Sequence, residues 1–436
     1  METKIQPSRR EDFGHGAGAI KTPSIVVIET QDHLRETSIR IAQALARPQT
    51  ANVFLVDWDR FHFSNDMVSF QGPVHCVKGC GIVEDRTILA PLPVRGMFFY
   101  RKNCGELIGG KAAALESLSA AGITTDGAPI HKIVDGMMLE ASRRGVITNA
   151  LGSSDTWGPK HCQELQLRRY ESATGQTIPR PETHIARPDQ MRRVLSIFAR
   201  RGQACLVKPA FGSLGRGFHI VRPGSSFQSN DIMVVQRLIP NPLLVDGHKA
   251  DIRFYLLIDV DNDRVSGRLS PIFIRRAAFP YVAQSLPAEI TNTSYRLRLG
   301  LAPDIRPIQP MPGISEHSYS LIISQLDSLA RALVNAHFWN AEHKSVETDG
   351  CIIPNRTLLL GIDALVAIRS SGPRVYFLES NPFPLLYRGT PDCDEAIDQM
   401  LSREYLPLLT RLDKLEARNP ERPQPALLVP QSPDSM

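Results

Sequence analysis

Two carboxylates and one amide stand close together in the C-terminal part of the sequence, on two segments that read as neighbouring β-strands. Asp363 lies in the run GIDAL, and Glu379 and Asn381 lie in the run YFLESNP. Side chains alternate along a strand, so Glu379 and Asn381 share one face. Apolar neighbours place both strands in the core, where a carboxylate needs a partner or a cation. The three side chains suit Mg²⁺, but the pattern also allows Glu379 to pair with an arginine and Asn381 to cap the turn before Pro382.

A glycine-rich segment in the middle of the chain is a second candidate site. In the run CLVKPAFGSLGRGFH, Lys208 ends a predicted strand, and Gly212, Gly215 and Gly217 precede the next strand. Glycines allow backbone N–H groups to close around phosphate oxygens, and Lys208 would add a positive charge there. A strand and not a helix follows the loop, so it is neither a Walker A loop nor a dinucleotide fingerprint. By itself the loop fits either a nucleotide-binding hairpin or an ordinary mobile turn.

A strand with alternating charges lies between these two segments. In the run DGHKADIRFY, Lys249, Asp251 and Arg253 point to one side, and the residues between them point to the core. A single strand of this kind is usually a solvated surface, but the nearby phosphate loop and acidic cluster favour the wall of a site. On a neighbouring strand, only one of Arg275 and Arg276 can share the face of Arg253, and we expect it to be Arg275.

Hydrophobic periodicity predicts the elements that must position these residues. The first part predicts a β-α-β unit and therefore a parallel sheet: strand 24–28, helix 31–47, strand 52–56, strand 97–100, helices 108–121 and 131–143, and strand 146–149. The second part is rich in long strands, which predicts a mixed region with an antiparallel sheet. Its strands are expected at 204–208, 217–221, 232–236, 250–259, 264–276, 357–368 and 373–379, and its helices at 159–173, 188–201, 314–338 and 394–412.

Composition sets the class of protein. The chain has 436 residues, 42% of them hydrophobic and 22% charged, as in a globular protein of roughly two or three domains. The net charge of +5 suits an acidic partner or an anionic cofactor but is not concentrated enough to indicate nucleic-acid binding. The seven scattered cysteines argue against a disulfide framework and for a reducing compartment. No apolar run is long enough for a membrane span or a signal peptide, so we expect a soluble, cytoplasmic protein.

Six segments occur in an order that closely resembles the tubulin–tyrosine ligase-like family, a branch of the ATP-grasp superfamily. They are VKPAFGSLGRG (207–217), VVQRLIPNPLLVDGHKADIRFY (234–255), FIRRAAFPY (273–281), ITN (290–292), GIDALV (361–366) and FLESNPFP (377–384). This resemblance covers about residues 160–414. The first 150 residues are similar to the domain that precedes the ATP-grasp fold in glutathione-synthetase-like ligases. The resemblance implies an α/β protein with an ATP-grasp fold and an N-terminal α/β (pre-ATP-grasp) domain.

The implied organisation has five parts. We expect a disordered tail at 1–21, the pre-ATP-grasp domain at 22–150, a lid subdomain with the glycine loop at 151–235, a C-terminal subdomain with the magnesium site at 236–415, and a disordered, Pro-rich tail at 416–436.

The resemblance also implies which residues bind the nucleotide. Lys160 and Lys208 would contact the phosphates of ATP, together with the glycines of the loop. Lys249 and Asp251 would hold the nucleotide further along. The adenine pocket and hinge would be formed by Gln236, Arg237, Leu238 and Ile239.

The remaining implied roles concern the metal and the reacting groups. Asp363, Glu379 and Asn381 would ligate Mg²⁺. Arg253 and Arg275 would bind carboxylates of the incoming amino acid or of the acceptor, and Asn292 would lie near the reacting centre.

Three positions depart from the family pattern. The family usually has Lys at Arg237, His at Glu289 and Glu at Leu358. Arginine in place of lysine keeps the charge but changes the geometry of the hinge. The ATP and metal residues are intact, so the departures bear mainly on the acceptor and the amino-acid pocket, where such ligases differ.

The implied activity is ATP-dependent ligation of a carboxylate to an amine through an acyl phosphate, with no enzyme nucleophile. The expected donor is an amino acid such as glutamate, glycine or tyrosine, and the expected acceptor is an acidic protein or peptide, for example a tubulin-like tail. One alternative is a ligase that makes a small-molecule or natural-product peptide bond. Another is a non-catalytic ATP-binding regulatory protein, against which the complete set of Asp363, Glu379 and Asn381 argues.

Overall fold

The computed structural model describes most of the chain beyond residue 159 and shorter segments before it. The described residues are 24–29, 35–46, 52–57, 61–64, 67–70, 73–78, 81–87, 92–99, 141, 146–148, 159–211, 217–261, 264–310, 314–344, 356–381, 384, 386, 390–401 and 403. The expected tails at 1–21 and 416–436 and the expected helix 108–121 lie outside these residues, as does the expected helix 131–143 apart from Ala141.

The first elements form the β-α-β unit that the sequence predicted. β1 (Ser24–Glu29) and β2 (Asn52–Asp57) pair in parallel and are joined through α1 (Arg35–Ala46). β7 (Leu92–Phe99) pairs in parallel with the other edge of β1. Four strands between β2 and β7 were not expected: β3 (Phe61–Ser64), β4 (Met67–Phe70), β5 (Pro73–Lys78) and β6 (Gly81–Thr87). These strands are short and mix polar with apolar side chains, so no clear period marks them in the sequence.

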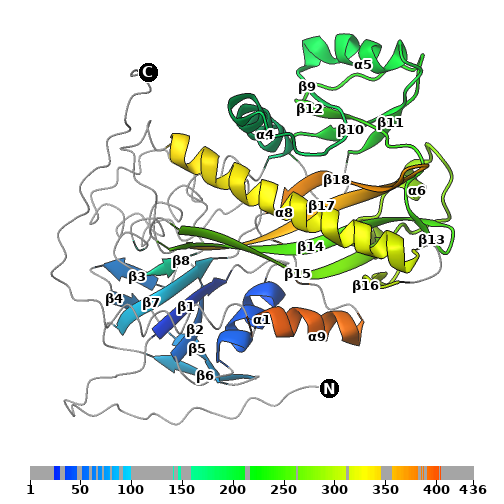
Figure 1. Ribbon diagram of the computed structural model, residues 1–436. Helices are drawn as coiled ribbons and strands as arrows, with labels where there is room; N and C mark the ends of the chain where they lie inside the picture. The colour runs from blue at the N-terminus through cyan, green and yellow to red at the C-terminus, as the bar shows by residue number, and fades with distance from the viewer. Residues whose placement is uncertain are drawn as a thin grey trace, which may run out of the picture.

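Long antiparallel strands form the rest of the same sheet. β14 (His248–Asp261) lies between β15 (Arg264–Arg276) and β17 (Arg356–Arg369), and β18 (Gly372–Asn381) pairs with β17. β16 (Ile305–Pro307) extends the sheet beyond β15. The short strand β8 (Ile147–Thr148) pairs in parallel with both β7 and β17. It therefore joins the N-terminal strands and the long strands into one continuous sheet (Figure 1).

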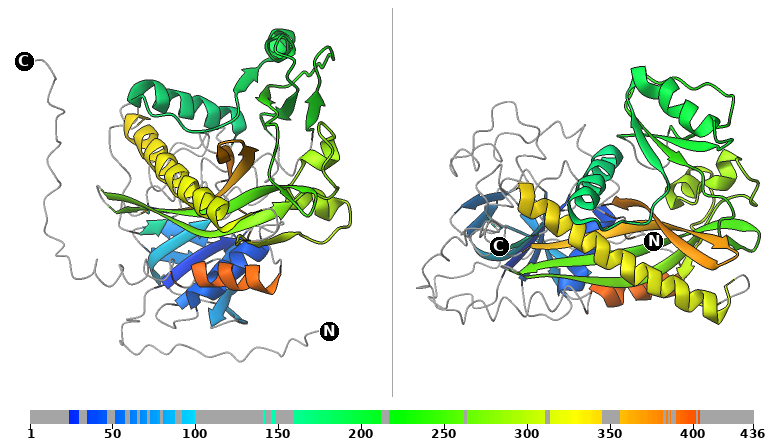
Figure 2. Two further views of the ribbon diagram at one scale, coloured as in Figure 1. Left: turned by 45° about the vertical axis from the view of Figure 1, so that its right-hand side comes forward. Right: turned by 45° about the horizontal axis from the view of Figure 1, so that its top comes forward.

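One face of the long strands is packed against the helix α8 (Glu316–Lys344), which lies along the sheet (Figures 1 and 2). Alternate residues of β14 enter this core, among them Ala250, Ile252 and Phe254. Apolar residues at helical spacing on α8 are buried here: Ile322, Leu326, Leu329 and Leu333. The alternate residues of β14 and the apolar face of α8 thus pack together in one layer.

The opposite face of the sheet is covered at one end by α1 and by α9 (Pro391–Met400), which lie together below the long strands in Figure 1. Tyr255 and Phe273 contribute to this second core. Arg40 of α1 binds Asp398 at 2.9 Å and Asp394 at 3.1 Å, so an ion-pair cluster links the two helices. The expected closing helix at 394–412 begins three residues earlier, at Pro391, and the described part of α9 ends at Met400.

A smaller antiparallel sheet stands apart from the large one, at the upper right of Figure 1. Its strand order is β11–β10–β12–β9, with bounds β9 (Thr183–Ala186), β10 (Cys205–Pro209), β11 (His219–Val221) and β12 (Met233–Arg237). The 3-10 helix η1 (Pro188–Gln190) leads into α5 (Met191–Ala199), whose apolar residues pack on this sheet. The helix α4 (Lys160–Thr174) contacts β12, β18 and α8. It therefore bridges the two sheets.

The remaining short elements are β13 (Leu244–Val245), α6 (Leu286–Glu289) and α7 (Thr293–Arg298). In the part of the chain that the structure describes, none of the helices combines the length and the apolar character that a bilayer crossing requires.

Candidate active site

Charged residues from three adjacent strands line up on the face of the sheet opposite α8. Arg253 of β14 is paired in the strand register with Asp363 of β17, and Asp363 is paired with Glu379 of β18. Side chains paired in this way have Cβ atoms about 5 Å apart. Two residues along β17, Gly361 is paired with Asn381. The three residues expected to ligate Mg²⁺ therefore occupy neighbouring positions on two paired strands.

Asp363 is buried and held by two arginines. Arg253 donates from Nε and Nη2 to the two carboxylate oxygens, the second bond being 2.8 Å long, and Nη2 of Arg275 lies 2.9 Å from Oδ1. Burial acts to raise the pKa of Asp363, but the charges and hydrogen bonds of the two arginines outweigh it, and the pKa is lowered. Asp363 is therefore ionised near neutral pH. Of the roughly four lone-pair positions of a carboxylate, three here receive arginine N–H groups.

Of the two consecutive arginines at the end of β15, Arg275 faces the site. It is buried and donates to the two oxygens of Asp251 at 2.9 and 2.6 Å. The hydroxyl of Thr291 donates to the same carboxylate at 2.6 Å. Arg276 is more exposed and forms an ion pair with Asp246, at the periphery. In this structure Asp251 thus holds Arg275 in place beside Asp363.

Lys249 is paired with a buried carboxylate, that of Glu289. Its Nζ donates to Oε2 of Glu289 at 2.6 Å, and both side chains are buried. The backbone N–H of Gln284 donates to Oε1 of Glu289 at 3.2 Å. Burial, together with the charge of Glu289 and a hydrogen bond to it, raises the pKa of Tyr281 to about 12. The charge of Lys249 is therefore balanced by the protein itself.

Lys208, at the phosphate loop, is buried between the two sheets. Its Nζ donates to Oε1 of Gln236 at 2.9 Å, and Nε2 of Gln236 donates to the hydroxyl of Thr183 at 3.2 Å. Burial lowers the pKa of Lys208 to about 8, while the charges of Glu379 and Lys160 act in opposite directions. A cavity of about 20 Å³ beside it has room for about one water molecule and is lined by residues of α4, the small sheet and β18.

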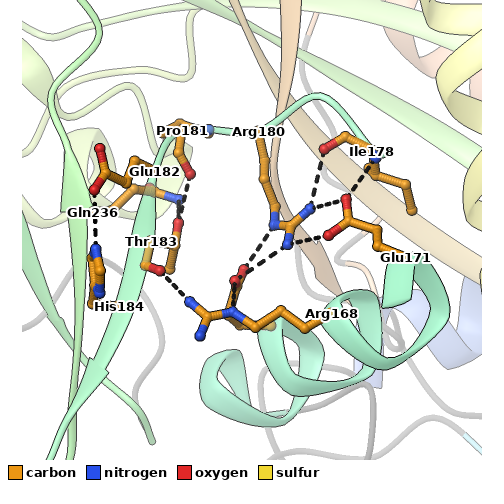
Figure 3. Close-up of polar contacts among 10 residues, drawn as sticks. Arg168, Glu171, Ile178, Arg180, Pro181, Glu182, Thr183, His184 and Gln236 are labelled. Carbon is orange, nitrogen blue, oxygen red and sulfur yellow. Dashed lines mark hydrogen bonds and ion pairs between the residues drawn. The ribbon is translucent and has the colours of Figure 1, made fainter. Parts of the chain in front are cut away.

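A polar network ties α4 to the segment that enters the small sheet (Figure 3). Arg180 donates from Nε to Oε2 of Glu164 at 2.9 Å and from Nη2 to Oε2 of Glu171 at 2.8 Å. Burial acts to raise the pKa of Glu171, but its bonds to Arg180 and to the backbone of Ile178 lower it. Arg180 thus holds two carboxylates of one helix face against the start of β9.

A second arginine extends this network toward Lys208. Nε of Arg168 donates to Glu164 at 2.6 Å, and its Nη2 donates to the backbone carbonyl of Thr183. The hydroxyl of the same threonine holds the amide of Gln236, which in turn accepts from Lys208. A continuous series of hydrogen bonds therefore runs from α4 to the lysine expected to bind phosphate.

The first turn of α4 reaches the acidic cluster. Lys160 is the first residue of the helix, and its Nζ lies 3.7 Å from Oε2 of Glu379. Gln163 is hydrogen-bonded to the backbone of Ser380. Both of the lysines expected at the ATP phosphates therefore lie close to this cluster, Lys160 directly and Lys208 through the electrostatic influence of Glu379.

The residues expected at the adenine pocket lie at the end of β12 and just beyond it. The backbone N–H groups of Arg237 and Leu238 donate to carbonyls of adjoining segments at 2.9 and 3.1 Å. Ile239 packs in a small apolar cluster against which Leu378 of β18 also lies. Among the described residues, Nε of Arg237 is a buried donor for which no acceptor is present. The hinge thus presents apolar side chains and one polar group at the boundary of the two sheets.

Of four further expected residues, Gly212, Gly215, Gly217 and Asn292, the structure places two. Gly212 and Gly215 lie outside the described residues. Gly217 has φ +69°, and a Cβ at this position would lie 2.8 Å from Cγ of Pro209, so glycine is required on both counts. Asn292 is half-buried, follows Thr291 directly and precedes α7. It is therefore one residue away from the group that binds Asp251.

The chemistry of the donor set fits a hard divalent cation. Two carboxylates and an amide oxygen at paired positions are ligands that Mg²⁺ prefers. Gly361 lies at the same place, where a Cβ would be 2.7 Å from Cβ of Pro384 and 2.8 Å from Nη1 of Arg253. No group of three or more His, Cys, Asp or Glu side chains forms a metal cluster among the residues described. An ion here would therefore depend on Asn381 and on phosphate oxygens as well as on Asp363 and Glu379.

Sequence reasoning missed the residues that hold the site residues in place. Glu164, Arg168 and Glu171 carry a signal only through their spacing of three and four, which puts them on one helix face. Arg180 and Thr183 carry no such signal. Such residues carry no motif because their partners come from other elements.

Comparison with known proteins extends the sequence resemblance. Residues 147–265 match the model of the Tubulin-tyrosine ligase family. Tubulin polyglutamylase TTLL7 of Homo sapiens is 39% identical over 59 residues, which are 14% of this chain and 7% of that protein. Tubulin polyglutamylase TTLL5 of Homo sapiens is 30% identical over 78 residues, which are 18% of this chain and 6% of that protein. The matching segment thus spans only a small part of these relatives.

The chain is similar in structure to the C-terminal domain of K. lactis Pby1, described as an ATP-grasp enzyme interacting with the mRNA decapping enzyme Dcp2. The TM-score is 0.51 at 14% identity, and the match covers 89% of this chain and 94% of that one. At this identity the likeness concerns the fold, and it confirms the α/β ATP-grasp fold expected from the sequence. Residues 147–265 thus resemble the Tubulin-tyrosine ligase family, and the chain has the ATP-grasp fold.

Proposed function

We propose that the chain is an ATP-dependent carboxylate–amine ligase that adds an amino acid to an acidic protein or peptide. One observation carries the proposal: Lys208 is close enough to Lys160, Lys249, Asp363 and Glu379 for their charges to affect its pKa. These residues come from separate segments of the chain. A cluster of lysines beside paired carboxylates offers a triphosphate and its divalent cation the charges that they need.

The reaction would proceed in two steps. An oxygen of the acceptor carboxylate attacks the γ-phosphorus of ATP, the bond to the bridging oxygen breaks, and ADP leaves an acyl phosphate behind. The amine nitrogen of the donor then attacks the acyl carbon, inorganic phosphate leaves, and the nitrogen loses its proton to solvent. No side chain forms a covalent bond, so catalysis would rest on position and charge.

Different residues of the chain would bind the phosphates, the substrate carboxylate and the metal ion. Lys160 and Lys208 would neutralise phosphate oxygens. Arg253 and Arg275 use Nε and Nη2 to hold the aspartates, so their Nη1 groups are the donors that would orient a substrate carboxylate. Mg²⁺ held by Asp363, Glu379 and Asn381 would offset the charge that develops on the transferred phosphoryl group.

Glutamate is the donor to test first, because the similar curated proteins are named tubulin polyglutamylases. The same names support an acidic, tubulin-like tail as the acceptor. The described cysteines Cys76, Cys162, Cys205 and Cys393 are free thiols. Free thiols suit a reducing compartment, which supports the cytoplasm as the site of the reaction.

The test is a screen of ADP release with the twenty amino acids, with and without an acidic peptide, read in parallel by mass spectrometry. We expect ADP release and a mass increase of the peptide with one donor. Glu379→Gln should abolish ADP release in a folded protein, and Glu316→Gln, an exposed change at the start of α8, is the matched control. Unchanged turnover in Glu379→Gln would contradict the assignment of Glu379 as a ligand of the metal ion.

The other outcomes of the screen distinguish the competing functions. ADP release with free amino acids but no mass increase of the peptide would indicate a small-molecule ligase. ATP binding with no ADP release under any condition would indicate a non-catalytic ATP-binding protein.

A further inference from the structure

The helix α4 begins at the free edge of β18, beside the expected metal ligands. Within the described residues, β18 pairs with β17 and with no other strand. An edge strand presents backbone N–H and C=O groups that need partners when water is excluded. Ser380, which separates Glu379 from Asn381, is 2% exposed, so its backbone cannot rely on solvent.

Gln163 supplies both partners for this backbone. Its Nε2 donates to the carbonyl of Ser380 at 2.6 Å, and its Oε1 accepts from the N–H of Ser380 at 3.0 Å. Gln163 is itself 3% exposed. One side-chain amide thus gives Ser380 the two bonds that a residue of a neighbouring strand would give.

The two bonds fix the two peptide planes that carry the ligands. The N–H of Ser380 belongs to the peptide unit that joins Glu379 to Ser380, and its C=O belongs to the unit that joins Ser380 to Asn381. Each unit is planar, so holding these atoms fixes how the chain enters residue 380 and how it leaves. The directions of the side chains at 379 and 381 follow from these two planes.

The pairing of β18 with β17 does not by itself fix this segment. Asp363 pairs with Glu379, but Ala364 pairs with Phe377, so the register shifts and Leu378 is the extra residue. Such a bulge disrupts the ladder locally and leaves the strand with fewer restraints. The bonds from Gln163 act beside this irregularity, and Lys160, three residues earlier on the same helix, approaches Glu379 from the same side.

We propose that Gln163 is a positioning residue for the metal site: it holds the backbone of Ser380 so that Glu379 and Asn381 point at the same divalent ion. This inference rests on the proposed function, because the ion belongs to the ATP-dependent reaction. Residues that orient metal ligands affect metal affinity by about 10- to 100-fold when they are replaced.

The test measures metal binding apart from turnover. Gln163→Met keeps the volume of the side chain and removes both hydrogen bonds. Binding of Mn²⁺ is followed by electron paramagnetic resonance with a non-hydrolysable ATP analogue present, and binding of the analogue alone is measured without metal. Gln166→Met, which removes another buried glutamine of α4, is the matched control. We expect Mn²⁺ affinity to fall about tenfold or more in Gln163→Met and to stay unchanged in the control, with metal-free binding of the analogue unaffected in both.

Three results would overturn the inference. Wild-type Mn²⁺ affinity in a folded Gln163→Met protein would show that the bonds do not position the ligands. An equal loss of metal-free analogue binding would indicate a general structural role. A wild-type protein that takes up no Mn²⁺ with the analogue would overturn the proposed function as well. If Gln163→Met does not fold, Gln163→Ala, which leaves room for water at Ser380, decides by the same measurements.

Discussion

Lys249 donates from Nζ to Oε2 of Glu289 at 2.6 Å, and both side chains are buried at the edge of the candidate active site. A lysine whose charge is already balanced has less attraction to offer a phosphate or a substrate carboxylate. The pair therefore sets the charge of this wall of the site before any ligand binds.

Replacing this carboxylate should release Lys249 toward ligands. In Glu289→Gln the amide still accepts from Lys249 but carries no charge. We expect the free energy of unfolding to fall by about 3 kcal/mol, because one partner of a buried ion pair is lost, and we expect ATP to bind more tightly. Urea unfolding without ligand and calorimetric titration with ATP measure the two effects. Weaker ATP binding in this variant would contradict this view of the pair.

The lowered pKa of Lys208 predicts a pH dependence of ATP binding. Burial brings this pKa to about 8, so the affinity of the empty protein for ATP should fall as the pH rises through that value. Above it, ATP binding should take up a proton, because the phosphates favour the charged lysine. Lys208→Arg keeps its charge and should flatten the profile. Calorimetry in buffers of different ionisation enthalpy measures how many protons are taken up when ATP binds. Equal proton uptake in the arginine variant would show that a group other than Lys208 takes up the proton.

The same shift has the opposite effect on folding. The unfolded chain keeps the proton of this lysine up to its ordinary pKa of 10.5, whereas the folded protein releases it at about 8. Because the unfolded state binds more protons between these values, the contribution of Lys208 to stability should become more favourable as the pH rises from about 8 toward 10.5.

Removing the charge of Asp363 and removing the charge of Glu379, two of the expected metal ligands, should change the free energy of unfolding by different amounts. Asp363→Asn leaves Arg253 and Arg275 buried beside a neutral amide, which should lower the free energy of unfolding by about 3–5 kcal/mol. Glu379 is less buried and lies 3.7 Å from its lysine, so Glu379→Gln should cost less than about 1 kcal/mol. Urea denaturation compares the two. Equal losses of stability in the two variants would show that Asp363 does not contribute more to the stability of the fold than Glu379 does.

Arg180 should stabilise the contact between α4 and the small sheet. Arg180→Lys removes the planar group that binds Glu164 and Glu171 together, and we expect a loss of about 1–3 kcal/mol in the free energy of unfolding. Arg331→Lys, at an exposed pair with Asp327 on α8, is the matched control and should change stability by less than about 0.5 kcal/mol. Chemical denaturation of both variants measures the difference. Equal effects would show that the hydrogen bonds of Arg180 do not contribute specially to the stability of the protein.

Much of the fold could be predicted because local patterns repeat. The alternation on β14 predicted which of its residues point to the core, and these residues pack against α8. The strand expected at 264–276 coincides with β15, and the strand expected at 357–368 lies within β17. The short strands β3 to β6 were not predicted, because four to seven residues of mixed polarity show no clear hydrophobic period.

The sequence by itself determined which side chains share a face and which residue types are available for phosphate, metal and carboxylate binding. It could not determine their partners. That Asp363 lies between Arg253 and Glu379, that Glu289 takes up Lys249, and that Gln163 holds the backbone of Ser380, 217 residues away, were decided by the tertiary structure. The physical reason is that periodicity acts within one strand or helix, whereas these contacts depend on the order and register in which distant segments pack.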